Sequence, residues 1–104
     1  MALIDLRQVN VYPYTKRITL GSTDVVQAIT LPGDCTRFSL QFISHPGKYS
    51  HTGTDGAAIG TDYATIAKDS VKVYDRSRRA GEQTIYVAGS TGSVVCELEL
   101  EARD

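Results

Sequence analysis

The sequence predicts an all-β fold, an antiparallel β-sandwich or jelly roll, and three observations lead to this class. Apolar and polar residues alternate with a period of two along most of the chain. Turn-forming residues separate the alternating runs at regular intervals. No window keeps the 3.6-residue period of a helix, and the nearest, residues 62–68, is short. Several short strands with regular turns are typical of sandwiches and small barrels.

The two clearest strands are expected at residues 36–43 and 93–102. In each, every second residue is apolar, so one face of the strand meets a core and the other meets water. The outer face of the later strand carries Glu97, Glu99 and Glu101, which we expect to keep it solvated and to discourage edge aggregation. Further strands, rich in Val, Ile and Thr, are expected at residues 16–20, 24–31, 70–74 and 83–88. The predicted core is Phe38, Leu40, Phe42, Val71, Val73, Ile85, Val87, Val94, Leu98 and Leu100.

Glycine-containing turns are expected to join neighbouring strands. Residues 89–92 read Gly-Ser-Thr-Gly and predict a hairpin between the last two strands. The preceding connection contains the one concentrated basic patch, Arg76, Arg78 and Arg79. This patch is either a contact for an acidic partner surface or a solvated hairpin tip. Aromatic residues are not interleaved with it, so the pattern does not favour nucleic acid.

Length and charge limit the number of domains and the partners. The chain has 104 residues, enough for one domain, and a net charge of −1 at pH 7. Such a charge attracts neither nucleic acid nor an anionic membrane, and it permits self-association because copies repel each other little. No segment approaches the roughly 20 apolar residues of a membrane helix. Asp5 and Arg7 interrupt the apolar residues that a secretory signal would need, so synthesis in the cytoplasm is expected.

Two regions depart from the strand rhythm. Residues 1–15 are apolar without clean alternation, and we expect either an edge strand or an extended arm preceding a sandwich domain at residues 16–104. An apolar arm needs a partner, so burial by another chain is predicted for Leu3, Ile4, Leu6, Val9 and Tyr12. Residues 45–61 hold four glycines among mostly polar residues, which predicts a long functional or mobile loop.

No residue pattern predicts catalysis, a cofactor or a metal. The phosphate-binding glycine loops and the Gly-x-Ser-x-Gly nucleophile elbow are missing. His45 and His51 lie six residues apart, which is not a usual zinc spacing. Cys35 and Cys96 could form a disulfide, but a protein without a secretory signal is made in a reducing compartment. We therefore expect two buried free thiols, no cofactor, no metal, and a protein that is not an enzyme.

Three segments, residues 25–42, 45–69 and 84–100, together form a layout of strands and turns that resembles a known family. It is similar to the small virion accessory proteins of tailed bacteriophages that decorate or cement the head shell. The resemblance implies self-association, often as trimers, attachment to the major capsid protein, and a location in the virion. Two alternatives stay open: a tail, neck or fibre-base component, and a carbohydrate-binding β-sandwich that reads sugar through Tyr49, Tyr63 and the polar loop.

Overall fold

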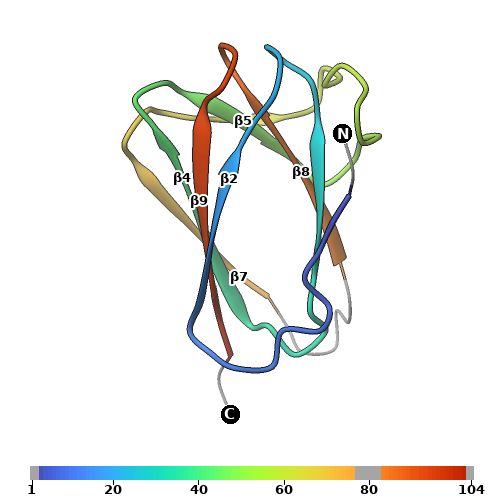
Figure 1. Cartoon of the computed structure of the whole chain (residues 1–104), viewed down its shortest axis with the longest axis vertical. Coiled ribbons are helices and arrows are strands. Elements are labelled where there is room, and N and C mark those ends of the chain that lie inside the picture. Colours follow the sequence, from blue (N-terminus) through green and yellow to red (C-terminus); the bar gives the residue numbers. More distant parts are fainter. Residues whose placement is uncertain (1–2, 77–82, 103–104) are drawn as a thin grey trace.

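The computed structural model describes residues 3–76 and 83–102, which form two packed β-sheets and no helix (Figure 1). A five-stranded sheet has the order β1-β3-β8-β5-β6, and a four-stranded sheet has the order β2-β9-β4-β7. The strands of the first sheet are β1 (Ile4–Asp5), β3 (Gln27–Leu31), β8 (Gln83–Gly89), β5 (Gly47–Ser50) and β6 (Ala64–Ile66). Those of the second are β2 (Tyr14–Thr19), β9 (Val95–Glu101), β4 (Arg37–Ile43) and β7 (Val71–Asp75).

The strand pairing is that of a jelly roll with β1 added at one edge. β2 pairs with β9, β3 with β8, β4 with β7 and β5 with β6, all antiparallel, so the chain is one nested hairpin wrapped into two sheets. Only β1 runs parallel to its neighbour, β3. The predicted all-β sandwich is therefore confirmed.

The two predicted hairpins are wrong. β8 and β9 lie in different sheets, so residues 89–92 cross from one sheet to the other. β7 and β8 are likewise in different sheets, so these two strands do not form a hairpin with each other. Sequence neighbours fail to pair here because each strand places its apolar face against the opposite sheet and finds its hydrogen-bond partner far along the chain.

The core lies between the two sheets and contains most of the predicted residues. Phe38, Leu40 and Phe42 on β4 meet Ile85 and Val87 on β8, with each of these side chains almost fully buried. Val94, Leu98 and Leu100 are also buried, as predicted.

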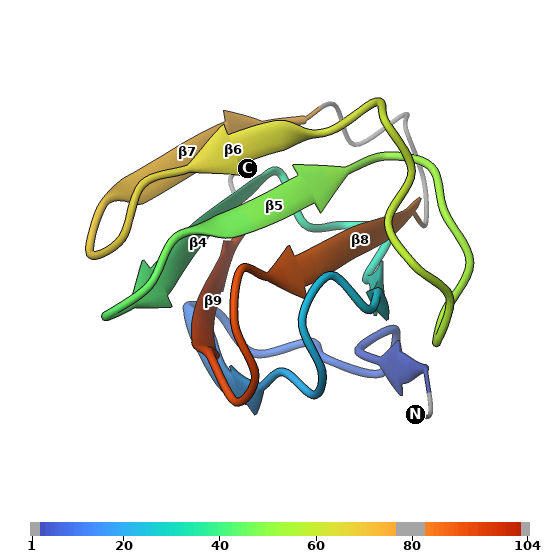
Figure 2. The ribbon, with the colours of Figure 1, turned by 90° about the horizontal axis from the view of Figure 1, so that it is seen from above.

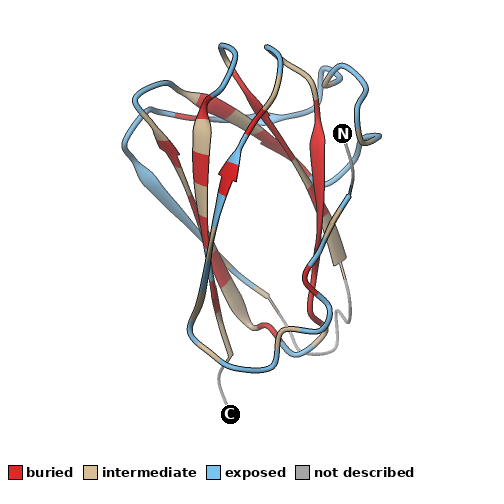
Figure 3. Ribbon diagram, viewed as in Figure 1, coloured by how far each residue is buried: buried red, intermediate tan, exposed pale blue. Residues whose placement is uncertain are grey.

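The prediction for β7 is wrong, since Val71 and Val73 are 58% and 51% exposed (Figure 3). The register with β4 explains this, because it places Lys72 opposite Leu40. Directly paired residues in an antiparallel sheet share a face, so both valines point away from the core.

Residues 1–15 are not a free arm. β1 pairs with β3, and the backbone N–H of Leu6 continues this pairing with a 2.9 Å bond to the carbonyl of Thr30. Leu6 is only 3% exposed and belongs to the core of its own chain. β2 begins at Tyr14, so the boundary expected between residues 15 and 16 falls inside a strand. The physical reason is that the edge of β3 offers unpaired backbone groups close to the N-terminal segment.

Residues 45–61 hold β5 and a segment that covers another strand edge. Three backbone hydrogen bonds tie residues 56–59 to residues 24–26, and the carboxylate of Asp55 accepts a 3.0 Å bond from the N–H of Ala28. These contacts close the part of the β3 edge that β1 does not reach. The segment is therefore polar for two reasons: it is exposed, and its polar groups form hydrogen bonds to this strand edge.

Candidate functional site

A cavity of about 450 Å³ opens at one side of the sandwich, where the two sheets end in the edge strands β6 and β7. Seen from above, β6 and β7 lie along the same side of the molecule (Figure 2). The lining comes from β5 and the residues that follow it, from the start of β6 and the residues that precede it, and from β7. The lining residues are Tyr49, Ser50, His51, Thr52, Asp62, Tyr63, Ala64 and Tyr74.

Aromatic rings form the inner wall of this cavity. The ring centre of Tyr49 lies 4.7 Å from that of Tyr74, and Tyr74 stacks on Phe38 at 5.1 Å. His51 meets Tyr49 edge-on at 4.9 Å. Tyr49 is 3% exposed, and burial raises the pKa of its phenol, as it does for Tyr74. The rings thus extend the hydrophobic core outwards to the cavity.

Hydrogen bonds fix the polar groups at the mouth of the cavity. The hydroxyl oxygen of Tyr49 lies 2.9 Å from Nε2 of His51, and the side-chain amide of Gln83 donates to Nδ1 of the same ring at 3.0 Å. Ser50 donates its hydroxyl to the backbone carbonyl of Asp62 at 2.9 Å. These bonds hold the end of β5 against the segment that leads into β6.

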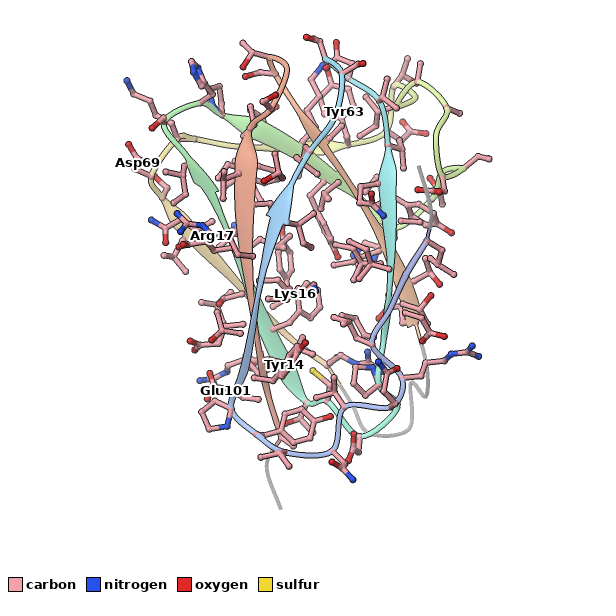
Figure 4. The ribbon with its side chains drawn as sticks, viewed as in Figure 1. Tyr14, Lys16, Arg17, Tyr63, Asp69 and Glu101 are labelled. Atoms are coloured by element: carbon pink, nitrogen blue, oxygen red, sulfur yellow. The ribbon has the colours of Figure 1, made fainter. Side chains whose placement is uncertain are left out.

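Tyr63 stands at the rim, where it is 39% exposed (Figure 4). The ammonium of Lys48 lies 4.6 Å from the centre of its ring and pairs with Asp24 at 2.9 Å. The hydrogen bond to Asp24 raises the pKa of Lys48, so the ammonium stays charged. The cation therefore steadies the Tyr63 ring and has its own counter-ion.

The outer face of the four-stranded sheet carries the glutamate row. Glu97, Glu99 and Glu101 lie on β9, which sits between β2 and β4 and is not an edge strand, contrary to the sequence prediction. The register places Arg17 beside Glu97, with 3.5 Å between their charged atoms. Arg37 lies opposite Glu101 but forms its ion pair with Asp75 at 2.8 Å. Figure 4 labels Arg17 and Glu101. Glu97 therefore pairs with a basic residue of the neighbouring strand β2, and all three glutamates keep the outer face of a central strand solvated.

The predicted interface residues do not come together on one surface. Leu6 is buried, while Ile4, Val9 and Tyr12 are partly buried against the core of their own chain, and Leu3 is 48% exposed. Tyr12 also donates a 2.6 Å hydrogen bond to Asp34, which anchors residues 9–13. Arg76 is half-buried just after β7, and its N–H donates to the carbonyl of Thr36 at 2.8 Å. Arg78 and Arg79 lie outside the described residues.

Neither cysteine is available as a nucleophile. Both are buried free thiols, as predicted. Burial raises the pKa of Cys96 to about 12 and also raises the pKa of Cys35. In the described ranges no group of three His, Cys, Asp or Glu side chains could hold a metal ion. Those ranges also contain no helix long and apolar enough to cross a membrane.

Comparisons with protein families, with curated proteins and with solved structures find no match to this chain. The function is therefore argued from the chain's own surfaces. Sequence reasoning had named two of the cavity residues, Tyr49 and Tyr63. It considered His51 and Asp62 only as metal ligands, and it missed Tyr74, although three of the six tyrosines fall within residues 49–74 and could have signalled an aromatic site.

Proposed function

We propose that this chain is a non-enzymatic structural protein of a tailed-phage particle, a head decoration or cement protein that binds the shell through strand β7. The observation that carries the proposal is the exposed apolar row on that strand. Val71 and Val73 are each more than half exposed. Exposed β-branched residues on a sheet edge are typical of a surface that another chain covers.

The backbone of β7 supports the same proposal. Among the described strands β7 pairs only with β4, so its other edge has unpaired N–H and carbonyl groups. A partner strand can add to such an edge, with main-chain hydrogen bonds giving affinity and the valines giving apolar contact. Both edge strands of this sheet carry a lysine, Lys16 on β2 and Lys72 on β7. On the outer face, however, β2 presents the charge of Arg17, which discourages pairing, whereas β7 presents its two valines. The contrast singles out β7.

The fold and the charge fit a protein present in many copies. Jelly rolls serve as building blocks of viral shells, although a fold alone does not determine a function. A net charge of −1 gives little repulsion between neighbouring copies. The partner in this proposal is the major capsid protein, with self-association into trimers as the resemblance implies, and many weak contacts on one shell would add up to tight attachment.

The proposal is tested by binding to bare capsids, measured as co-sedimentation. Val73→Lys adds a charge to the β7 surface at an exposed position, so the protein should stay folded while its apparent affinity falls at least tenfold. Val11→Lys is the matched control, because Val11 is a 73% exposed valine that lies outside β7, in the segment before β2. Equal binding by the two variants would refute the role of β7.

A second measurement places the chain within the particle. Quantitative mass spectrometry of purified heads and of purified tails should find the chain in the heads, at a fixed ratio to the capsid protein. Recovery with the tails would favour the tail, neck or fibre-base alternative. Absence from whole particles would overturn the proposed function.

A further inference from the structure

We infer that the cavity between β5, β6 and β7 is a binding site for a saccharide, with Tyr63 as the stacking platform and Asp62 as a hydrogen-bond acceptor. The virion role proposed above does not use this cavity. The inference rests on the shape and chemistry of the lining and stands whether or not the chain belongs to a particle.

The size and position of the cavity suit a small ligand. Its volume of about 450 Å³ lies within the range of roughly 300–1,000 Å³ that is usual for small-molecule sites. It opens at the side of the sandwich, so a ligand reaches it without any separation of the sheets. Tyr49 and Tyr74 form a packed inner wall, which keeps the cavity open in the absence of a ligand.

The lining combines the two kinds of group that a sugar ring needs. The exposed ring of Tyr63 offers a flat apolar surface to the C–H groups of a pyranose. Asp62 and Thr52 belong to the same lining, and their carboxylate and hydroxyl can exchange hydrogen bonds with sugar hydroxyls. Both ring nitrogens of His51 are already bonded, to Tyr49 and Gln83. Since both kinds of group lie on one concave surface, the lining fits a neutral hydroxylated ring better than a purely apolar ligand.

Charge argues against an anionic ligand. The cavity lining contains no Lys or Arg, and its one charged side chain is the carboxylate of Asp62. The nearby ammonium of Lys48 is paired with Asp24 and lies over one face of the Tyr63 ring, which leaves the other face for a ligand. A phosphate or carboxylate would find no cation in the cavity and would be repelled by Asp62.

A quaternary ammonium is the main competing ligand, because tyrosines and a carboxylate can form a cage around a cation. The cage needs several aromatic faces directed at one point. Tyr49 is only 3% exposed, with its ring in contact with Tyr74 and His51, so it cannot supply a face. Tyr74 is likewise packed between Phe38 and Tyr49, so Tyr63 alone supplies a face. A single platform matches a ring better than a compact cation.

The test begins with the full-length chain on a glycan array that covers hexoses, N-acetylhexosamines, deoxyhexoses and uronates. Glycans that bind are then titrated into ¹⁵N-labelled protein, with choline chloride and sodium phosphate as parallel titrations. We expect saturable shifts at residues 49–52, 62–64 and 74 with at least one saccharide, and no saturable shift there with either salt.

Variants link the binding to the named residues. Tyr63→Ala should weaken the saccharide about tenfold, whereas Tyr63→Phe, which keeps the ring, should bind within about twofold of the parent protein. Asp62→Asn should also weaken binding, and Glu99→Gln is its matched control, since it removes a carboxylate on the outer face of β9. Melting curves of all four variants show that a loss of binding is not a loss of fold.

Three results would overturn the inference. The first is the absence of any bound glycan on the array. The second is a shift pattern that maps away from the cavity, or tight binding of choline at the cavity without saccharide binding. The third is unchanged affinity in Tyr63→Ala. Failure of the virion proposal leaves these measurements untouched, because Val73→Lys alters β7 on the face opposite to the side chain of Tyr74.

Discussion

Replacing Gly47 by alanine should destabilise the fold strongly, because the added methyl group has no space. Gly47 begins β5, where it pairs with Gly89 of β8 and Ile66 of β6. A Cβ atom at this position would overlap the Cγ, Cδ1 and Cε1 atoms of the Phe42 ring. Phe42 is fully buried, so its ring cannot turn towards solvent. Either the ring or β5 must move, and both are held by neighbours on all sides.

The expected loss in the free energy of unfolding is estimated from the packing of Phe42 that the added methyl group would disturb. Overpacking a core by a methyl group costs about 1–3 kcal/mol, and deleting a buried phenylalanine side chain costs about 3–5 kcal/mol. Because the overlap involves three ring carbons, we place Gly47→Ala near the boundary of these ranges, at about 3 kcal/mol. That is a large part of the stability of a domain of this size, typically about 5–15 kcal/mol.

Urea unfolding followed by far-ultraviolet circular dichroism measures the effect. Gly60→Ala is the matched control, since a Cβ there meets nothing within 4 Å. It should change the free energy of unfolding by less than about 1 kcal/mol. The double variant Gly47→Ala/Phe42→Leu should cost at least about 1 kcal/mol less than the sum of its single variants, because the smaller side chain leaves room for the methyl group. A cost below about 1 kcal/mol for Gly47→Ala, or strict additivity, would refute the packing argument.

Three further predictions concern stability. Leu6→Ala should lower the free energy of unfolding by about 3 kcal/mol in urea titrations, since Leu6 is buried in its own domain; a change below about 1 kcal/mol would mean that residues 1–15 are dispensable for folding. Tyr12→Phe should cost about 1 kcal/mol, because it removes the hydrogen bond to Asp34, and Asp34→Asn tests the same bond from the other side. The raised pKa of Cys96 should leave the free energy of unfolding unaffected below pH 9 and lower it as pH rises towards about 12, because the thiol loses its proton in the unfolded state first. Cys96→Ala should lose less stability over this pH window. Identical pH profiles of the two proteins would contradict this reasoning.

The sequence was sufficient to predict the fold class and the faces of the long strands. β4 and β9 have clean alternation, and in both the structure buries the expected residues. β7 shows where the pattern becomes ambiguous. Its alternation of Val with Lys and Tyr fits either face, and only the pairing with β4 decides which side is buried. Hydrophobicity suggested the valines, whereas the aromatic ring of Tyr74 fills the space beside Phe38.

Long-range pairing was the part that the sequence could not supply. Turn residues show where the chain reverses, but they do not show whether it returns within a sheet or crosses to the opposite one. The cavity depends on this distinction, since Tyr49 and Tyr74 come from different sheets and meet only because β5 and β7 lie at the same side of the sandwich. For the same reason the sequence left an edge strand and an extended arm as alternatives for residues 1–15, because the edge of β3 cannot be seen in the sequence.

The nested pairing also determines when the domain can fold during its synthesis. β9 occupies the middle of the four-stranded sheet, between β2 and β4, yet it leaves the ribosome after the other three strands of that sheet. Until it emerges, β2 has no partner in that sheet, and the apolar faces of the earlier strands stay uncovered. A topology dominated by such distant contacts closes slowly and exposes the nascent chain to aggregation. A stop codon placed just before residue 95 should therefore yield an insoluble product, even though most of the chain has been made.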